Sequence, residues 1–274
     1  HEVVKFIRNY LDERKFLEIE TPILIKSTPE GARDFLVPSR IHPGDFYALP
    51  QSPQQLKQLL MVAGTDKYFQ IARCFRDEDP RADRLPEFTQ LDVEMSFVDR
   101  DDIVDLMIDL YVDLIHSVKP DKKIPLPIPR FTFKEAMERF GSDKPDIRYS
   151  LEIADISDIV KESPFQVFST MVSNGGYVKG FAAPGIADIP RRQADELIDL
   201  AKNYGAKGLV TIAIDASSSS ISSLTLDQVR TPAKALSIDE IKLIAEKCNA
   251  GPGDLILIAA GTKTLTENVL GQLR

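Results

Sequence analysis

The amino-acid sequence predicts an α+β protein with two domains, residues 1–142 and 143–274. Three observations favour this class. Segments 68–76 and 88–97 have the alternating apolar and polar residues of strands, and the charged loop between them is typical of an antiparallel pair. Apolar residues at helical spacing precede and follow this pair. After the turn-forming residues at 141–145 the chain changes to shorter alternating strands and helices, which indicates a second, smaller α+β domain.

The first domain is expected to begin with a helix and a short strand. Apolar residues repeat at helical spacing from Val3 to Leu11, with charged residues on the other side. Residues 16–21 favour a strand that ends at Pro22, because proline cannot donate a hydrogen bond into a continuing ladder. Residues 28–40 contain several turn-forming residues and predict a loop.

A second helix is expected to start at Ser52 and Pro53, since serine caps free backbone amides and proline suits the first helical position. Its buried side is expected to contain the apolar residues Leu56, Leu59, Leu60 and Ala63. Gln54 and Lys57 lie on the opposite side, so an amide and an ammonium would project together near the start of the helix. This side is a candidate ligand-facing edge.

The strand at 88–97 separates its side chains onto two faces. One face is expected to point into a core and contains Leu91, Val93, Met95 and Phe97. The other face contains Phe88, Gln90, Asp92 and Glu94. A solvated charged hairpin is one interpretation of the second face, but an aromatic ring among polar residues, with Arg76 ending the neighbouring strand, favours a ligand site. Guanidinium, ring, amide and carboxylates together suit a nucleotide phosphate and a polar or cationic group.

The remaining pattern predicts mostly regular structure. Further helices are expected at 101–118, 131–140 (still in the first domain), 191–204 and 238–248, and further strands at 208–214 and 255–260. Residues 175–185 form a glycine-punctuated stretch. The phosphate-binding patterns GxGxxG and GxxxxGK[ST] are absent, which argues against the Rossmann and P-loop routes to nucleotide binding.

Composition restricts the class of protein. The net charge of −8 argues against binding nucleic acid through a general positive field. The two cysteines, Cys74 and Cys248, lie far apart without metal-ligand spacing, so no metal site is predicted. No run of about 18 apolar residues exists to span a membrane, and the start of the chain does not look like a signal peptide. A cytoplasmic protein is expected.

Several segments resemble the class II aminoacyl-tRNA synthetases. FRDE at 75–78 resembles the arginine-bearing second signature of that class, and FLEIETPIL at 16–24 is similar to the first signature. The run RCFRDEDPRADRLPEFTQLDVEMSF at 73–97 resembles the bacterial aspartyl-tRNA synthetase family in particular, as do TPEGARDFLVPSR and ALPQSPQQLKQLL. From GSDKPDIR at 141–148 onward the chain resembles the insertion domain of that bacterial branch. The resemblance covers essentially the whole chain.

The resemblance implies a set of site residues on a partial class II antiparallel sheet flanked by helices. L-aspartate would be bound by Glu30, Gln54, Lys57, Arg76 and Asp92, with Arg76 as the catalytic residue. ATP, arriving as its Mg2+ complex, would be bound by Arg76, Asp77, Glu78, Leu85, Phe88 and Gln90. The tRNA acceptor end would meet Asp77 and Arg84, and Pro22 would lie in a homodimer interface. Leu85 stands where the family usually has glutamine, so the chain departs from the pattern at one ATP contact.

The resemblance implies ATP-dependent activation of aspartate and its transfer to tRNA(Asp); whether tRNA(Asn) is charged as well stays open. The family's N-terminal anticodon-binding barrel and third signature are not found in this sequence, so we expect the chain by itself not to form adenylate. Aspartate-dependent pyrophosphate exchange by this chain would refute that expectation. Two alternatives remain: an asparaginyl-type class II enzyme, and a non-catalytic relative that serves RNA binding or dimerisation.

Overall fold

The structure is a computed structural model that describes residues 1–28, 30–80 and 84–274. It divides into two compact units, unit 1 (His1–Pro129) and unit 2 (Arg130–Arg274). Both units combine helices with sheets, so the predicted α+β class is confirmed. Residue 29, in the loop predicted at 28–40, and residues 81–83, between the two predicted strands, lie outside the described residues.

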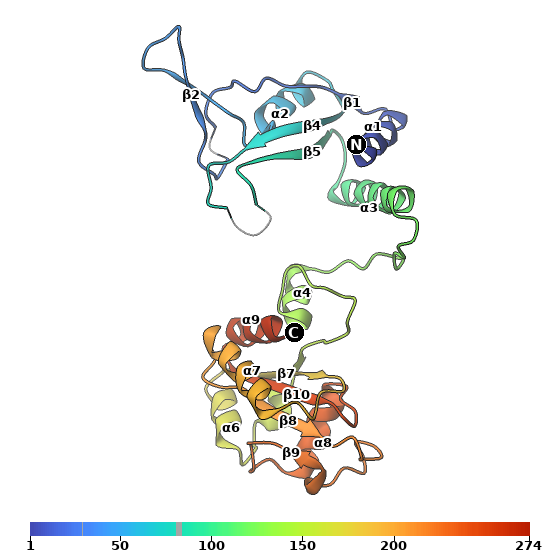
Figure 1. Cartoon of the computed structure of the whole chain (residues 1–274), viewed down its shortest axis with the longest axis vertical. Helices are drawn as coiled ribbons and strands as arrows, with labels where there is room; N and C mark the ends of the chain where they lie inside the picture. Colours follow the sequence, from blue (N-terminus) through green and yellow to red (C-terminus); the bar gives the residue numbers. More distant parts are fainter. Residues whose placement is uncertain (29, 81–83) are drawn as a thin grey trace. The chain divides into compact units, whose positions relative to one another are not determined.

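Unit 1 is built on a three-stranded sheet with the order β1-β4-β5 (Figure 1). Its elements in chain order are α1 (Glu2–Glu13), β1 (Leu17–Glu18), β2 (Leu36–Pro38), β3 (Phe46–Ala48), α2 (Gln54–Val62), β4 (Lys67–Phe75), β5 (Glu87–Met95) and α3 (Arg100–Val118). Strands β4 and β5 are antiparallel, as predicted, while the short β1 joins β4 in parallel. A separate antiparallel hairpin pairs β2, which falls inside the loop predicted at 28–40, with β3, for which the sequence predicted no element.

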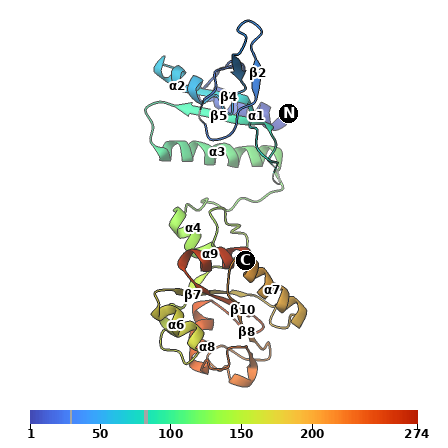
Figure 2. The same cartoon turned by 90° about the vertical axis from the view of Figure 1, so that its left-hand side faces the viewer.

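Helices α1 and α3 cover one face of this sheet, and Figure 2 shows α3 running along the β4–β5 pair. The core between them contains Leu11, Phe16, Phe69 and Leu110, and the β5 residues Leu91, Val93 and Met95 pack against it as predicted. The prediction for Phe97 is wrong. Strand β5 ends at Met95, and Phe97 has a left-handed φ of 59° and a side chain that is 96% exposed. The backbone turn breaks the alternation on which the prediction rested.

Helix α2 is rotated relative to the expectation from its apolar residues. Lys57 is its buried side chain, while Leu59 is 62% exposed. Pro53 occupies the N-cap position, and the hydroxyl of Ser52 donates instead to Glu30 at 2.8 Å. Helix α2 therefore faces β5 with a lysine, because two carboxylates on that strand outweigh the apolar pattern.

Unit 2 is a three-layer structure around a five-stranded antiparallel sheet with the order β6-β7-β10-β8-β9. Its elements are α4 (Phe133–Phe140), β6 (Ala154–Asp155), α5 (Ser157–Val160), α6 (Gln166–Ser173), β7 (Tyr177–Ala183), α7 (Arg191–Asn203), β8 (Val210–Ile214), a 3-10 turn (Leu226–Gln228), β9 (Val229–Arg230), α8 (Ile238–Lys247), β10 (Leu255–Gly261) and α9 (Lys263–Leu273). Helices α5, α6 and α8 pack on one apolar face of the sheet, and α7 and α9 pack on the other.

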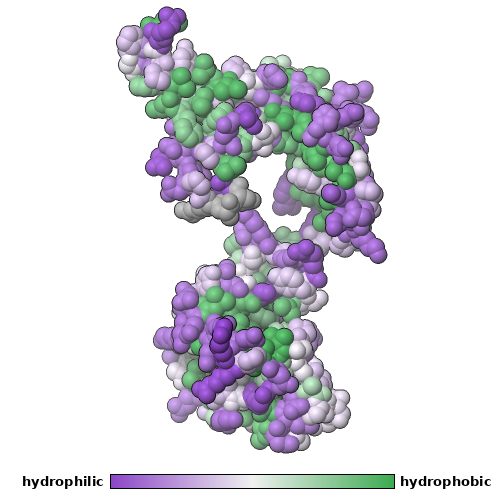
Figure 3. Space-filling view, viewed as in Figure 1, coloured by the Kyte–Doolittle hydropathy of each residue, from purple (hydrophilic) through white to green (hydrophobic). Residues whose placement is uncertain are grey.

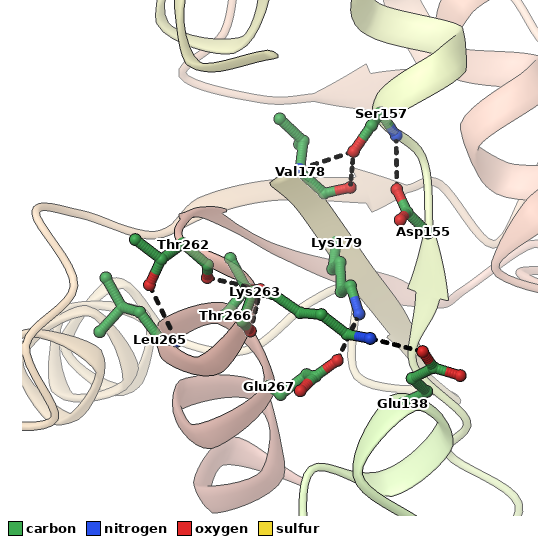
Figure 4. Close-up of polar contacts among 10 residues, drawn as sticks. All are labelled: Glu138, Asp155, Ser157, Val178, Lys179, Thr262, Lys263, Leu265, Thr266 and Glu267. Atoms are coloured by element: carbon green, nitrogen blue, oxygen red, sulfur yellow. Dashed lines mark hydrogen bonds and ion pairs between the residues drawn. The ribbon is translucent and has the colours of Figure 1, made fainter. Parts of the chain in front are cut away.

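Helix α4 belongs to unit 2, so the boundary lies after Pro129 and not after residue 142 as expected. The reason is the close approach of α4 to α9. A Cβ added to Gly141 would lie 2.1 Å from the carbonyl oxygen of Glu267 in α9, a distance that only glycine permits. Lys263 of α9 also donates to Glu138 of α4 at 2.5 Å (Figure 4).

A second ion pair lies beside this contact, inside unit 2. Lys179 of β7 and Glu267 of α9 point toward one another in Figure 4, and their charged atoms are 2.7 Å apart. Both side chains are buried. The pair joins the sheet to α9. Removing either charge would destabilise unit 2, because the other charge would stay buried without a partner.

Candidate active site

The face of the β4–β5 pair that points away from α3 carries the candidate site. The strand register places on this face the even-numbered residues of both strands: Tyr68, Gln70, Ala72, Cys74, Phe88, Gln90, Asp92 and Glu94. The β4 members are buried, so this face is not that of a solvated hairpin. Sequence reasoning found the β5 half and missed the β4 half. The alternation of Tyr68, Gln70 and Cys74 along β4 was the available signal.

Lys57 is the centre of a charge cluster on this face. Its Nζ lies 2.9 Å from Oδ1 of Asp92 and 3.2 Å from Oε2 of Glu94. Burial by itself lowers the pKa of Lys57, but the hydrogen bonds and charges of Asp92 and Glu94 outweigh burial and raise the pKa above its ordinary value. The ammonium therefore stays charged, and it faces β5 instead of solvent.

The second carboxylate oxygen of Asp92 is a buried acceptor that lacks a donor among the described residues. The hydroxyl of Tyr68 is close enough to Asp92 to lower the pKa of that carboxyl, but its hydrogen bond is donated to Oε1 of Gln70, at 2.7 Å. Thr21 donates to the same oxygen at 3.0 Å. Burial raises the pKa of Asp92, Lys57 opposes the shift, and Glu94 adds to it. An unpaired buried oxygen of this kind is suited to a cationic group of a ligand.

Arg76 and Phe88 form the next part of the face. The guanidinium carbon of Arg76 lies 5.0 Å from the centre of the Phe88 ring, within the range of a cation–π contact. Arg76 follows the last residue of β4, and its backbone amide donates to the carbonyl oxygen of Pro86 beside β5. The ring and this backbone bond hold a half-buried guanidinium at the strand end, which suits it to bind an anionic group by two parallel hydrogen bonds.

Glu30 is joined to the start of α2. Its two carboxylate oxygens accept hydrogen bonds from Thr28 and Ser52, each at 2.8 Å. It lines a cavity of about 290 Å3 together with Pro22, Ser52 and other residues of the 22–56 region. Gln54, two residues after Ser52, is half-buried at the first position of α2. The structure thus brings Glu30, Gln54 and Lys57 to one end of α2.

A second cavity, of about 320 Å3, is lined by Arg33, Asp77, Glu78, Arg84 and their neighbours. Arg33 was not predicted from the sequence. Its Nε donates to the carbonyl oxygen of Asp77 at 3.1 Å, and the Asp77 amide donates to the carbonyl oxygen of Arg33 at 3.0 Å. The basic residue inside the segment TPEGARDF was the signal that could have identified it. Leu85, by contrast, is 64% exposed.

The loop that carries Arg33 is held by a buried glutamine that sequence reasoning also missed. Nε2 of Gln51 donates to the carbonyl oxygen of Ala32 at 2.8 Å, and the Ala32 amide donates to Oε1 of Gln51 at 3.0 Å. Gln51 is 3% exposed. These two hydrogen bonds hold the loop against the segment that joins β3 to α2.

The arrangement can bind a small molecule that carries both charges, next to an anion. Lys57 supplies a cation, and Asp92 and Glu30 supply hydrogen-bond acceptors. The guanidinium of Arg76 can bind a phosphate through two parallel hydrogen bonds. Within the described ranges, no group of three or more His, Cys, Asp and Glu side chains is placed to hold a metal ion. Every helix in the described part of the chain is too short or too polar to span a bilayer.

Known protein families and curated proteins include relatives of this chain. Residues 1–249 match the family described as tRNA synthetases class II (D, K and N). Proteins named aspartate–tRNA(Asp/Asn) ligase are similar over the whole chain: 57% identity in Dehalococcoides mccartyi, 52% in Halothermothrix orenii and 51% in Moorella thermoacetica. The chain spans 46%, 45% and 44% of these relatives, respectively, which is less than half of their length. This chain therefore belongs to the class II tRNA synthetases of the D, K and N group.

Proposed function

We propose that this chain carries part of the catalytic core of an aspartate–tRNA ligase, which uses ATP to join L-aspartate to tRNA. The observation that carries the proposal is the buried Lys57 ammonium between Asp92 and Glu94, on the same strand face as the Arg76–Phe88 pair. A charged, buried lysine ammonium beside carboxylates suits an amino acid whose side chain carries a second carboxylate. The names of the relatives agree with that choice.

Aspartate is the ligand that best matches the charges around Lys57. The side-chain carboxylate of aspartate would pair with the Lys57 ammonium, which burial keeps away from competing water. The substrate ammonium would bind the unpartnered Oδ2 of Asp92, with Glu30 and Gln54 completing the contacts. Asparagine has an uncharged side-chain amide, so it would form no ion pair with the Lys57 ammonium.

ATP would lie along the Arg76 end of the face as its magnesium complex. Arg76 would bind the α-phosphate, Glu78 would orient it, and Phe88 would offer its ring to the adenine. Gln90 would contact the nucleotide beside Phe88. Leu85 is exposed at the rim, where it could contribute only apolar contact.

The reaction would consist of two displacements. A carboxylate oxygen of aspartate attacks the α-phosphorus of ATP, the bond to the bridging oxygen breaks, and pyrophosphate leaves with the electron pair. A terminal ribose hydroxyl of tRNA then attacks the acyl carbon and releases AMP. The protein contributes position and charge: Lys57 orients the amino acid, and Arg76 stabilises the negative charge that develops on the phosphate.

The partners would be tRNA(Asp), with tRNA(Asn) as a second acceptor suggested by the relatives' names, and a second copy of the protein. Asp77 and Arg84 line one cavity and would meet the tRNA acceptor end. Pro22 is followed by Ile23 and Leu24, which are 45% and 53% exposed; apolar surface of this kind is visible on unit 1 in Figure 3. Such surface supports a homodimer through this segment. Unit 2 would be the insertion domain, and the enzyme would act in the cytoplasm.

The proposal is tested by titrating the complete gene product that carries this chain with L-aspartate and with L-asparagine in a calorimeter. We expect binding of aspartate, and a loss of at least tenfold in affinity in Lys57→Gln, since a charge-assisted hydrogen bond contributes about 1.5–3 kcal/mol. Lys67→Gln is the matched control, because Lys67 lies on the opposite face of β4 from the site and donates only to the carbonyl oxygen of Arg14 among the described residues. Tighter binding of asparagine would favour the asparaginyl-type enzyme. Absence of adenylate formation would favour a non-catalytic module.

A further inference from the structure

Cys74 is a buried thiol on the ligand face that the proposed chemistry leaves without a role. It is 0% exposed and lies on β4 directly opposite Phe88 of β5. Its Sγ lies 3.1 Å from Oε1 of Gln90 and 3.8 Å from the carbonyl oxygen of Ala72. Ala72 is the register partner of Gln90 and has too short a side chain to hold the amide. Among the described residues, the thiol is therefore the contact that orients Gln90 from β4.

The Cys74 thiol keeps its proton. Burial raises its pKa to about 11; Arg76 acts in the opposite direction, and Asp92 and Glu30 add to the increase. A protonated thiol is a hydrogen-bond donor, and here the acceptor is the amide oxygen of Gln90. Because the oxygen and nitrogen of an amide diverge from one carbon, engaging the oxygen turns the NH2 group away from Cys74. Cys74 lies two residues before Arg76, directly opposite Phe88, and contacts Gln90, so it adjoins three of the proposed site residues.

We propose that Cys74 is a positioning residue, which holds the Gln90 amide so that its NH2 group faces the nucleotide as a donor. This inference rests on the proposed function. Without the thiol, the amide can rotate by half a turn and present its oxygen to the oxygen atoms of the ribose or phosphate. A thiol suits this task because it fills an apolar space and still donates one hydrogen bond.

The test is steady-state aspartate-dependent ATP–pyrophosphate exchange by the complete gene product. In Cys74→Ala we expect the KM for ATP to rise about two- to tenfold, the worth of one neutral hydrogen bond, with kcat and the KM for aspartate nearly unchanged. Cys74→Ser keeps a donor and should restore the KM to within about twofold of the wild type. Cys248→Ala is the matched control, since Cys248 is also a buried free cysteine but lies in unit 2, and its replacement should leave every constant unchanged.

A double-mutant cycle with Gln90 separates positioning from loss of packing. In a Gln90→Ala background, Cys74→Ala should add no further increase in the KM for ATP, because the amide that it orients is gone. Equal effects of Cys74→Ala in both backgrounds, or equal KM values for Cys74→Ala and Cys74→Ser, would overturn the inference.

The same series distinguishes this inference from the proposed function. If the wild type shows no exchange with aspartate, the proposed function fails. If Gln90→Ala leaves the KM for ATP unchanged, the nucleotide role of Gln90 fails and the inference fails with it. If Gln90→Ala raises the KM and Cys74→Ala does not, only the role of Cys74 is overturned. If the Cys74→Ala protein does not fold, Cys74→Val takes its place as the variant without a donor and is compared with Cys74→Ser, which keeps one.

Discussion

Replacing Lys57 with methionine should destabilise unit 1 strongly, because it leaves two carboxylates without their cation. The Lys57 and Asp92 side chains are each 11% exposed, whereas Glu94 is 31% exposed and can turn to water. Removing one partner of a buried pair costs about 3–5 kcal/mol, and the partial exposure of Glu94 favours the lower end, about 3 kcal/mol. Methionine preserves the apolar stem of the lysine, so the loss reports the charge and not a cavity.

The assay is native-state hydrogen exchange at the backbone amides of β4 and β5, which reports the opening of unit 1 separately from unit 2. A loss of about 3 kcal/mol in the stability of unit 1 should accelerate hydrogen exchange through the unfolding of that unit by roughly a hundredfold. Arg73→Met is the matched control: Arg73 pairs with Glu87 at 2.8 Å on the same two strands, but the side chains are 55% and 52% exposed. Such an exposed pair contributes below about 1 kcal/mol.

The penalty of Lys57→Met should also depend on pH in a defined direction. Burial raises the pKa of Asp92, and Lys57 opposes that shift, so removing Lys57 raises the pKa further. A carboxyl whose pKa is higher in the folded than in the unfolded chain destabilises the fold while ionised, and the cost fades as pH falls through the folded pKa. The penalty should therefore shrink as the pH is lowered from about 7 toward about 4. Exchange accelerated no more than in Arg73→Met, or a penalty that grows in acid, would show that Lys57 does not stabilise unit 1 through these carboxylates.

Three further changes test the packing of both units. Gly271→Ala would place a Cβ 2.3 Å from the carbonyl oxygen of the glycine that ends α4, so it should lower the stability of unit 2 by about 1–3 kcal/mol. Gly208→Ala, where a Cβ meets nothing within 4 Å, should leave the stability of unit 2 nearly unchanged. Urea titration of the two variants measures both effects. Lys179→Met should lower the free energy of unfolding of unit 2 by about 3–5 kcal/mol, because it leaves Glu267 buried and unpaired. The double variant Lys179→Met, Glu267→Leu should recover most of this stability, and equal losses in the two proteins would contradict the prediction. Phe97→Asn should raise the free energy of unfolding of unit 1 by about 0.5–1 kcal/mol, because asparagine tolerates the left-handed backbone better; a lower urea midpoint than in the wild type would count against this explanation.

The sequence predicted the fold best where one periodicity held over many residues. The alternation of β5 correctly assigned Leu91, Val93 and Met95 to the core, and the long apolar stripe of α3 was confirmed. Prediction failed where tertiary contacts overrode a local pattern. Lys57 is buried because of carboxylates on a strand distant in sequence, and Phe97 leaves the core because the chain turns there. No pattern local to α2 contains that information.

The candidate site was predicted in part for a similar reason. The β5 residues and Arg76 could be found from alternation and from the resemblance to class II signatures, since both are local properties of the sequence. Cys74, Gln51 and Arg33 were missed because they act through contacts between segments: strand to strand for Cys74, and loop to loop for the other two. The domain boundary was misplaced because the glycine contact between α4 and α9 joins residues far apart in the chain.

The most direct test of the central claim, that the β4–β5 face is an aspartyl-adenylate site, is ATP–pyrophosphate exchange by the complete gene product with each of aspartate and asparagine. We expect exchange that depends on aspartate, and a loss of at least about a hundredfold in kcat for Arg76→Ala, since removing a transition-state anion contact costs about 3 kcal/mol. Exchange driven equally by asparagine, or exchange that survives Arg76→Ala unchanged, would contradict it.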